Sequence, residues 1–333
     1  MRRSGPVIAV LVVLALVSVI YFVVPGFSIP RNGAEPSGTG PGSSSGSAPG
    51  LDFPTMVTDR VLPAPAGSNA TDRVTRTYPY VLRGETGTLR LDLDPGLYHR
   101  LAAGSPPLVC TMPVSGLDPC PDAEVARYYR GVIDRPEERL YLDALVQAIR
   151  GRTVVRDDQA RIAISLVQQI PYGYNESYAN GSGNLRTPSM ILYDRSGICD
   201  EKSLLLAYLL RELGYGVVLF SFPGQEHTAI GIRSPAAYAY NATGYAFVET
   251  TFPAIVTDDQ GEYGNGGRLA GPPVLYPIAD GIAFDSIAFE YADAREFIRL
   301  RESVRTSGTR LNGASRTEVQ DLCRKYGLYS CTT

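Results

Sequence analysis

The sequence of 333 residues contains no tryptophan, only two histidines and only five cysteines. A structural or catalytic zinc site usually needs three or four Cys, His or carboxylate ligands, and these few side chains offer no recognisable spacing. The glycine motifs that cradle phosphates or dinucleotides are missing, and the sequence has no convincing Gly-x-Ser-x-Gly elbow of the serine hydrolases. We therefore expect neither a metal ion nor another cofactor.

Strong charge of either sign is also missing. The formal net charge is -3, with no long run of like charges. Such a chain lacks the basic field that attracts nucleic acid, so nucleic acid is not an expected partner.

One long apolar run stands near the N-terminus. It extends from Val7 to Val24, interrupted only by Ser18, and follows Arg2 and Arg3. This length predicts a transmembrane helix with its N-terminus inside, and we assign residues 1–27 to a membrane anchor. A cleaved signal peptide is the alternative, but the run exceeds a usual signal core and lacks a clear small-x-small cleavage site.

Residues 28–54 are rich in Gly, Ser and Pro and predict a flexible linker. The folded part is then expected outside the cytoplasm, on a single-pass protein of the cell membrane. Four Asn-x-Ser/Thr sequons agree with this location. They are Asn69, Asn175, Asn180 and Asn241.

The cysteines divide into two local pairs and one remainder. Cys110 with Cys120, and Cys323 with Cys331, each bracket a short segment and predict two disulfides in an oxidising compartment. Cys199 is left alone, and an odd cysteine in such a protein is either a buried inert thiol or a reactive one.

The folded part has the patterns of an α+β protein. Residues 55–122 predict a β-rich segment with alternating strands over 74–98. Residues 123–257 predict the core, and 258–333 a C-terminal extension. Within them, we expect helices over 123–149, 157–170, 285–304 and 315–326, and strands over 217–222, 227–232 and 246–251. A further helix runs from an N-cap at Ser196 to Gly214.

Cys199 falls in the first turn of that helix, within Arg195-Ser-Gly-Ile-Cys-Asp-Glu-Lys-Ser203. A helix N-terminus and a nearby imidazolium both lower the pKa of a thiol and favour the nucleophilic thiolate. Asp200 and Glu201 oppose this effect with negative charge. His227, at the start of a predicted strand, must therefore supply most of the activation.

Glu249 lies among apolar residues in the next predicted strand, where a carboxylate needs a donor, and His227 is its natural partner. Asp258 and Asp259 are weaker candidates for the same role, because their glycine-containing context resembles a turn. One residue of the set Gln168, Gln169 and Tyr172 is expected to donate to a developing oxyanion. Taken singly, Cys199 and His227 also fit ordinary buried residues, but their order along the chain favours a catalytic triad.

These residues resemble the transglutaminase-like superfamily of papain-type cysteine enzymes, in particular the membrane-attached transglutaminase-like predicted peptidases of archaea. The matching stretches are 167–172, 195–214, 226–227 and 247–251. The resemblance implies a transglutaminase-like or papain-like core, in which the helix bearing Cys199 packs on an antiparallel sheet and His227 is general base and acid. The family usually has aspartate before x-Thr, where this chain has Glu249.

Three functions remain open from sequence. The first is a membrane-anchored hydrolase that cleaves peptide or amide bonds of a protein or peptide substrate through a thioester. The second is transfer of amines to glutamine side chains, as in transglutaminases. The third is a non-catalytic surface module that uses the same fold for binding.

Overall fold

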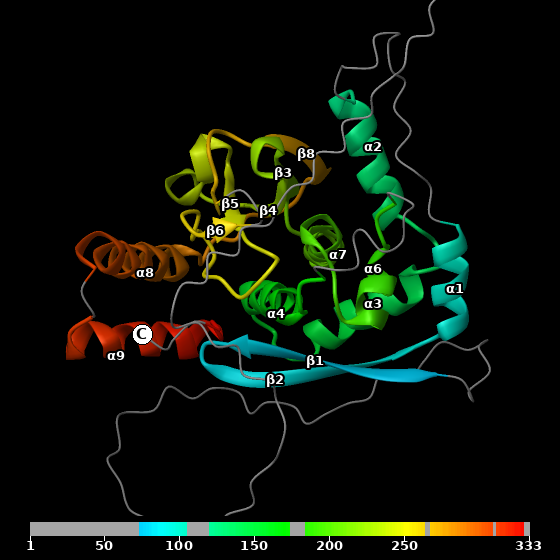
Figure 1. The fold of residues 1–333 in the computed structure, drawn as a ribbon. Helices are drawn as coiled ribbons and strands as arrows, with labels where there is room; N and C mark the ends of the chain where they lie inside the picture. The colour runs from blue at the N-terminus through cyan, green and yellow to red at the C-terminus, as the bar shows by residue number, and fades with distance from the viewer. Residues whose placement is uncertain (1–72, 105–119, 174–183, 264–266, 309–310, 330–333) are drawn as a thin grey trace, which may run out of the picture. The chain divides into compact units, whose positions relative to one another are not determined.

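An antiparallel four-stranded sheet supports the central part of the protein (Figure 1). The computed structural model describes residues 73–104, 120–173, 184–263, 267–308 and 311–329. All of them belong to one compact unit, Pro54–Thr333. The structure therefore has the predicted α+β class, with antiparallel sheets.

The strand order of this sheet is β5-β4-β3-β8. The strands are β3 (Val217–Phe222), β4 (His227–Arg233), β5 (Tyr245–Val248) and β8 (Val274–Ala279). A 3-10 turn at Pro223–Gln225 joins β3 to β4 and pairs Phe222 with His227. The three strands predicted between residues 217 and 251 are thus confirmed, although β5 ends three residues earlier than expected. β8, from the segment predicted to be a C-terminal extension, completes the sheet.

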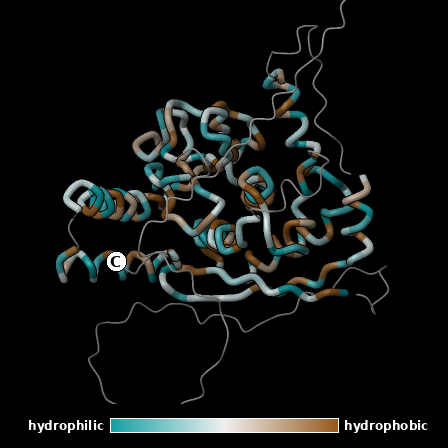
Figure 2. Tube along the Cα trace, in the orientation of Figure 1, coloured by the Kyte–Doolittle hydropathy of each residue, from teal (hydrophilic) through white to brown (hydrophobic). Residues whose placement is uncertain are grey.

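Two buried helices lie between this sheet and a separate hairpin. Helix α7 (Cys199–Glu212) contacts β3 and β4, and α4 (Arg156–Gln169) lies between α7 and the hairpin (Figure 1). The hairpin pairs β1 (Val74–Leu82) with β2 (Glu85–Leu93). Hydrophobic residues gather where these layers meet (Figure 2).

The remaining elements surround this core. They are α1 (Pro95–Ala103), α2 (Asp122–Ile133), α3 (Arg139–Arg150), α6 (Pro188–Asp194), the two-residue strands β6 (Glu262–Tyr263) and β7 (Gly267–Arg268), α8 (Ala288–Ser307) and α9 (Gly313–Tyr326). The helical stretch expected over 123–149 is divided into α2 and α3 around Pro136, whose ring is disfavoured inside a helix.

The helix that carries Cys199 begins later than predicted. Ile198, with an extended backbone, precedes the first helical residue, and Ser196 is not the cap. Glu201 Oε2 accepts a hydrogen bond from the Ile198 backbone N–H at 3.0 Å and so satisfies the start of the helix. The C-terminal prediction is confirmed, because Gly214 follows the helix with a φ of +94°.

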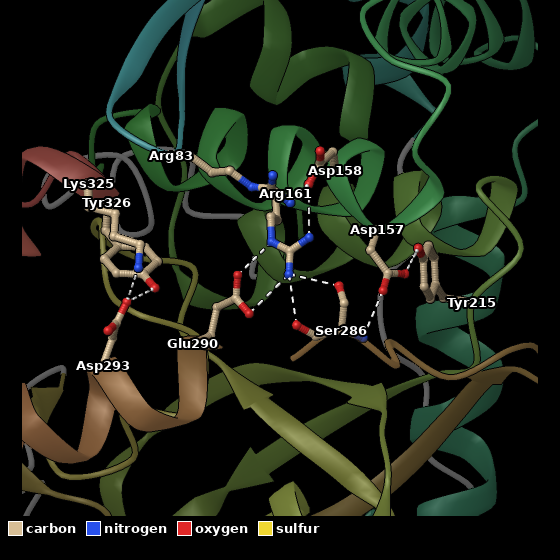
Figure 3. Close-up of polar contacts among 10 residues, drawn as sticks. All are labelled: Arg83, Asp157, Asp158, Arg161, Tyr215, Ser286, Glu290, Asp293, Lys325 and Tyr326. Atoms are coloured by element: carbon tan, nitrogen blue, oxygen red, sulfur yellow. Dashed lines mark hydrogen bonds and ion pairs between the residues drawn. The ribbon is translucent and has the colours of Figure 1, made fainter. Parts of the chain in front are cut away.

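The C-terminal helices are joined to α4 by charged side chains (Figure 3). Arg161 of α4 donates to Glu290 of α8 at 2.5 Å and 3.1 Å, to Asp158 at 2.9 Å, and to Ser286. On the neighbouring helix α9, Lys325 and Tyr326 both donate to Asp293 of α8. The Arg161 side chain is only 10% exposed, so its ion pairs are largely shielded from water.

Several predictions fall on residues that the structure does not describe. These are the anchor at 1–27, the linker at 28–54, Cys110, Cys331 and the sequons at Asn69, Asn175 and Asn180. Within the described part of the chain, no helix has the length and apolarity needed to cross a membrane. Asn241, the remaining sequon, is exposed in a 3-10 turn.

We expect Arg161→Met to lower the free energy of unfolding by about 3–5 kcal/mol, because it leaves the buried carboxylate of Glu290 without its counterion and leaves Asp158 with Arg83 alone. Urea unfolding measures this change. The control is Arg299→Met, which removes an exposed pair with Glu296 on α8 and should leave the urea midpoint almost unchanged. Equal midpoints for the two variants would show that Arg161 does not join the helices.

Candidate active site

Cys199 is the first residue of α7 and lies against the start of β4. The residue is 6% exposed. Its thiol is 3.6 Å from Asp200 Oδ2 and 4.0 Å from the backbone carbonyl oxygen of Glu226, the residue before His227. The helix and the strand therefore bring the sulfur next to the histidine-bearing turn.

His227 and Glu249 form a buried pair. The distance between His227 Nε2 and Glu249 Oε2 is 2.9 Å, and the two side chains are 1% and 0% exposed. Glu249 Oε1 accepts three further hydrogen bonds, from the backbone N–H groups of Thr250 and Thr251 and from the Thr251 hydroxyl. Burial acts to raise the pKa of Glu249, but His227 and the Thr251 donors outweigh it and hold the pKa below its usual value.

The pair fixes which imidazole nitrogen is available for chemistry. An ionised Glu249 can only accept a hydrogen bond, so His227 Nε2 must carry the proton that it donates to this carboxylate. In a neutral ring, Nδ1 is then the nitrogen without a proton, and it can act as an acceptor. Nδ1 is buried and has no hydrogen-bond partner among the described residues. A buried acceptor without a partner is costly, and such groups concentrate at functional sites.

Two aromatic rings stack on the imidazole of His227. The Tyr263 ring stacks on His227 at 5.5 Å and the Phe222 ring at 6.5 Å. The Tyr263 hydroxyl donates to the carbonyl oxygen of Asp258, whose carboxylate forms two 2.8 Å hydrogen bonds with Arg301 of α8. The C-terminal segment thus holds the histidine through Tyr263.

The alternative carboxylates are engaged elsewhere. Asp258 pairs with Arg301, and Asp259 pairs with Arg295 at 2.9 Å. Glu249 is the one of the three that the structure places on the histidine.

The thiol environment differs from the sequence-based expectation. Burial first, and the negative charge of Asp200 second, raise the pKa of Cys199 well above that of a free thiol. Backbone donors of Thr228 and Asp200 oppose this shift without reversing it. Burial and the charge of Asp200 therefore both favour the neutral thiol over the thiolate.

Of the three oxyanion candidates, only Tyr172 lies beside the thiol. A β-bridge joins Tyr172 to Gly197, two residues before the cysteine, and burial followed by the charge of Cys199 raises the pKa of its hydroxyl. Gln168 instead donates both amide hydrogens, to the carbonyl oxygens of Glu249 and Ala254. Gln169 donates to the carbonyl oxygen of Gly327. The amide nitrogens of both glutamines thus already have backbone acceptors, so of the three candidates we retain Tyr172 as the oxyanion donor.

Lys202, which the sequence reading did not single out, is fully buried one turn after Cys199. Its ammonium donates to the carbonyl oxygens of Ile170 and Thr251, the latter at 2.9 Å, with Gln168 O at 3.5 Å. It thereby connects the cysteine helix with the segments that carry Tyr172 and Glu249. Burial lowers the pKa of Lys202 to about 7. A lysine within a leucine-rich helical stretch is the sequence feature from which the burial of Lys202 could have been predicted.

The other two cysteines in the described part of the chain differ from Cys199. Cys120 and Cys323 are disulfide-bonded. Cys199 is a free thiol, and it is the one free cysteine in the described part of the chain. Within that part, no group of three His, Cys, Asp or Glu side chains is arranged to hold a metal ion.

No family model matches the chain, and comparison with curated proteins and with solved structures gave no match either.

We expect the free energy of unfolding of the wild type to rise relative to that of Lys202→Met between pH 7 and pH 10.5. The pKa of Lys202 is lowered from 10.5 to about 7 in the folded protein, so over this window the unfolded state binds more protons. Urea unfolding at a series of pH values measures the difference. A difference that stays constant or falls with pH would contradict the assigned burial of the ammonium.

The thiol should react with iodoacetamide only at high pH. We expect an apparent pKa above the value of about 8.5 for a free thiol, and a lower one in Asp200→Asn, because that variant loses the neighbouring negative charge. Mass spectrometry of the peptide containing Cys199 measures labelling. Asp321→Asn, an exposed carboxylate on α9, serves as the control. A wild-type midpoint well below 8.5 would contradict the burial argument.

Proposed function

We propose that the chain is a transglutaminase-like cysteine hydrolase that cleaves peptide or amide bonds with Cys199, His227 and Glu249. The observation that supports this most directly is the His227–Glu249 pair, which leaves Nδ1 unpartnered beside the turn that contacts the sulfur. Nucleophile, base and orienting carboxylate then follow the order required for an activated thiol.

In this mechanism the thiol loses its proton as it attacks. His227 Nδ1 accepts the proton while the sulfur forms a bond to the substrate carbonyl carbon. The Tyr172 hydroxyl is positioned to donate to the oxyanion. The imidazolium then protonates the leaving amine, the C–N bond breaks, and a thioester remains. Water, deprotonated by the same imidazole, releases the acid and restores the thiol.

The raised pKa of Cys199 fits a general base better than a resting ion pair. A thiol held neutral by burial and by Asp200 needs an acceptor during attack, and a neutral imidazole with a free Nδ1 is such an acceptor. Glu249 stabilises the imidazolium that forms, because its carboxylate remains ionised.

We place this hydrolase outside the cytoplasm on a single-pass membrane anchor, with a protein or peptide as its substrate. Support comes from the apolar run at residues 7–24 and from the disulfides of Cys120 and Cys323, since such bonds persist in oxidising compartments.

Substitution of the triad tests the proposal against a library of peptide and amide substrates. Cys199→Ala should abolish turnover, and Glu249→Gln should reduce kcat about 10²- to 10⁴-fold by misorienting the imidazole. His99→Ala, which removes the exposed histidine of α1, is the matched control and should retain wild-type turnover.

Product analysis separates the remaining outcomes. Free acids identify a hydrolase, whereas products labelled by an added amine identify an acyltransferase. Full turnover in Cys199→Ala would overturn the proposal, because the reaction would then not use this thiol. The absence of turnover from the wild type across the library would overturn it in favour of a non-catalytic module.

A further inference from the structure

Asp200 follows the candidate nucleophile and is held in a fixed orientation. Its Oδ1 accepts hydrogen bonds from the Tyr129 hydroxyl of α2 and the Thr228 hydroxyl of β4, both at 2.9 Å. The other oxygen, Oδ2, is 3.6 Å from the sulfur of Cys199. Two elements far apart in the sequence thus direct one carboxylate oxygen toward the reacting atom.

This carboxylate has no counterion in the described part of the chain. No Lys or Arg there forms an ion pair with Asp200, whereas the next residue, Glu201, pairs with Arg186 at 2.8 Å. Asp200 is partly buried, so water screens its charge only in part. An unpaired and partly buried carboxylate attracts a positive charge more strongly than an exposed one does.

Three tyrosine side chains interact electrostatically with the same carboxylate. Burial raises the pKa of Tyr128, Tyr129 and Tyr172, and in each case the negative charge of Asp200 adds to the effect. The Tyr129 hydroxyl contacts Asp200 directly, and the Tyr128 ring lies 6.0 Å from the Tyr129 ring, centroid to centroid. Aromatic rings beside a carboxylate suit an ammonium or guanidinium group, which is attracted both by the charge and by the ring faces.

We propose that Asp200 and these tyrosines form a subsite for a positively charged group, so that preferred substrates carry an ammonium or guanidinium next to the scissile carbonyl. The inference rests on the proposed function and names its substrate class. A purely structural role for Asp200 would explain the two hydrogen bonds that Oδ1 accepts. The amide oxygen of an asparagine could accept the same two bonds, so this role does not require a negative charge. The structural role leaves unexplained why a negative charge stands beside a thiol that must become an anion.

Cation binding also resolves this electrostatic conflict. A positive group at Asp200 offsets the charge that disfavours ionisation of Cys199, so the correct substrate eases loss of the thiol proton. Substrates with an acidic group at this place are repelled by the same carboxylate. The subsite therefore combines selection of the substrate with activation of the nucleophile.

Charge-matched thiol reagents test the subsite without a known substrate. The full-length protein is treated with cationic aminoethyl methanethiosulfonate or anionic sulfonatoethyl methanethiosulfonate, and labelling of Cys199 is followed by mass spectrometry. The measured quantity is the ratio of the two rate constants, divided by the same ratio for a free small-molecule thiol. Any change in the pKa of the thiol affects both reagents equally and cancels in this ratio.

We expect the normalised ratio of the wild type to favour the cationic reagent and to fall about ten-fold or more in Asp200→Asn, because one unit charge attracts one reagent and repels the other. Added salt should reduce the wild-type preference. The matched control is Glu226→Gln, which removes an exposed carboxylate next to His227 and should leave the ratio within about two-fold of the wild type.

Three results would overturn the subsite. They are equal ratios for the wild type and Asp200→Asn, a loss of preference in Glu226→Gln alone, and no labelling of native Cys199 by the cationic reagent. The first two can occur in an active hydrolase, so they separate the subsite from the proposed function. Conversely, a charge preference with no turnover of any substrate would support a cation-binding site and reject the hydrolase.

Discussion

The buried carboxylate of Glu249 is the constraint on which the site depends. A side chain with no exposure must have every charge and lone pair satisfied by protein groups, since water cannot reach it. Glu249 meets this requirement with one imidazole and three donors from the next two residues. The chain must therefore turn immediately after β5, and this turn determines where α4 and α7 can approach.

The first turn of α7 connects this carboxylate with the rest of the core. Glu201 pairs with Arg186, Lys202 reaches the carbonyl oxygens of Ile170 and Thr251, and the Ser203 hydroxyl contacts Thr228 O and Thr250 Oγ1. Together these three consecutive side chains contact several segments, and Lys202 and Ser203 both contact the turn at Thr250 and Thr251. Cys199 is consequently fixed by its neighbours on the helix as well as by its own contacts, which is how a pre-organised site is built.

Much of this arrangement could be predicted from local sequence. Alternating and β-branched residues located β3, β4 and the hairpin, and elimination led to Cys199 and His227 because so few residues of either type exist. The partners of buried polar residues could not be predicted in this way. Periodicity indicated that Gln168 lies on a largely buried helix, yet it does not say that its amide holds the loop after β5. The contact of Tyr263 with His227 could not be predicted from local sequence either, because the two residues are 36 positions apart.

The glutamate itself explains part of the departure from the aspartate that the resemblance implies. Oε1 of Glu249 reaches back to the amides of Thr250 and Thr251 while Oε2 reaches His227. A carboxylate one methylene shorter would lie closer to its own backbone and could not span the same two groups without a shift of β5 toward β4. Because that strand pair is fixed by the register of Ile230 with Val248, the longer side chain is the one that fits this sheet. The side-chain length of the acidic residue must therefore match the register of the two strands.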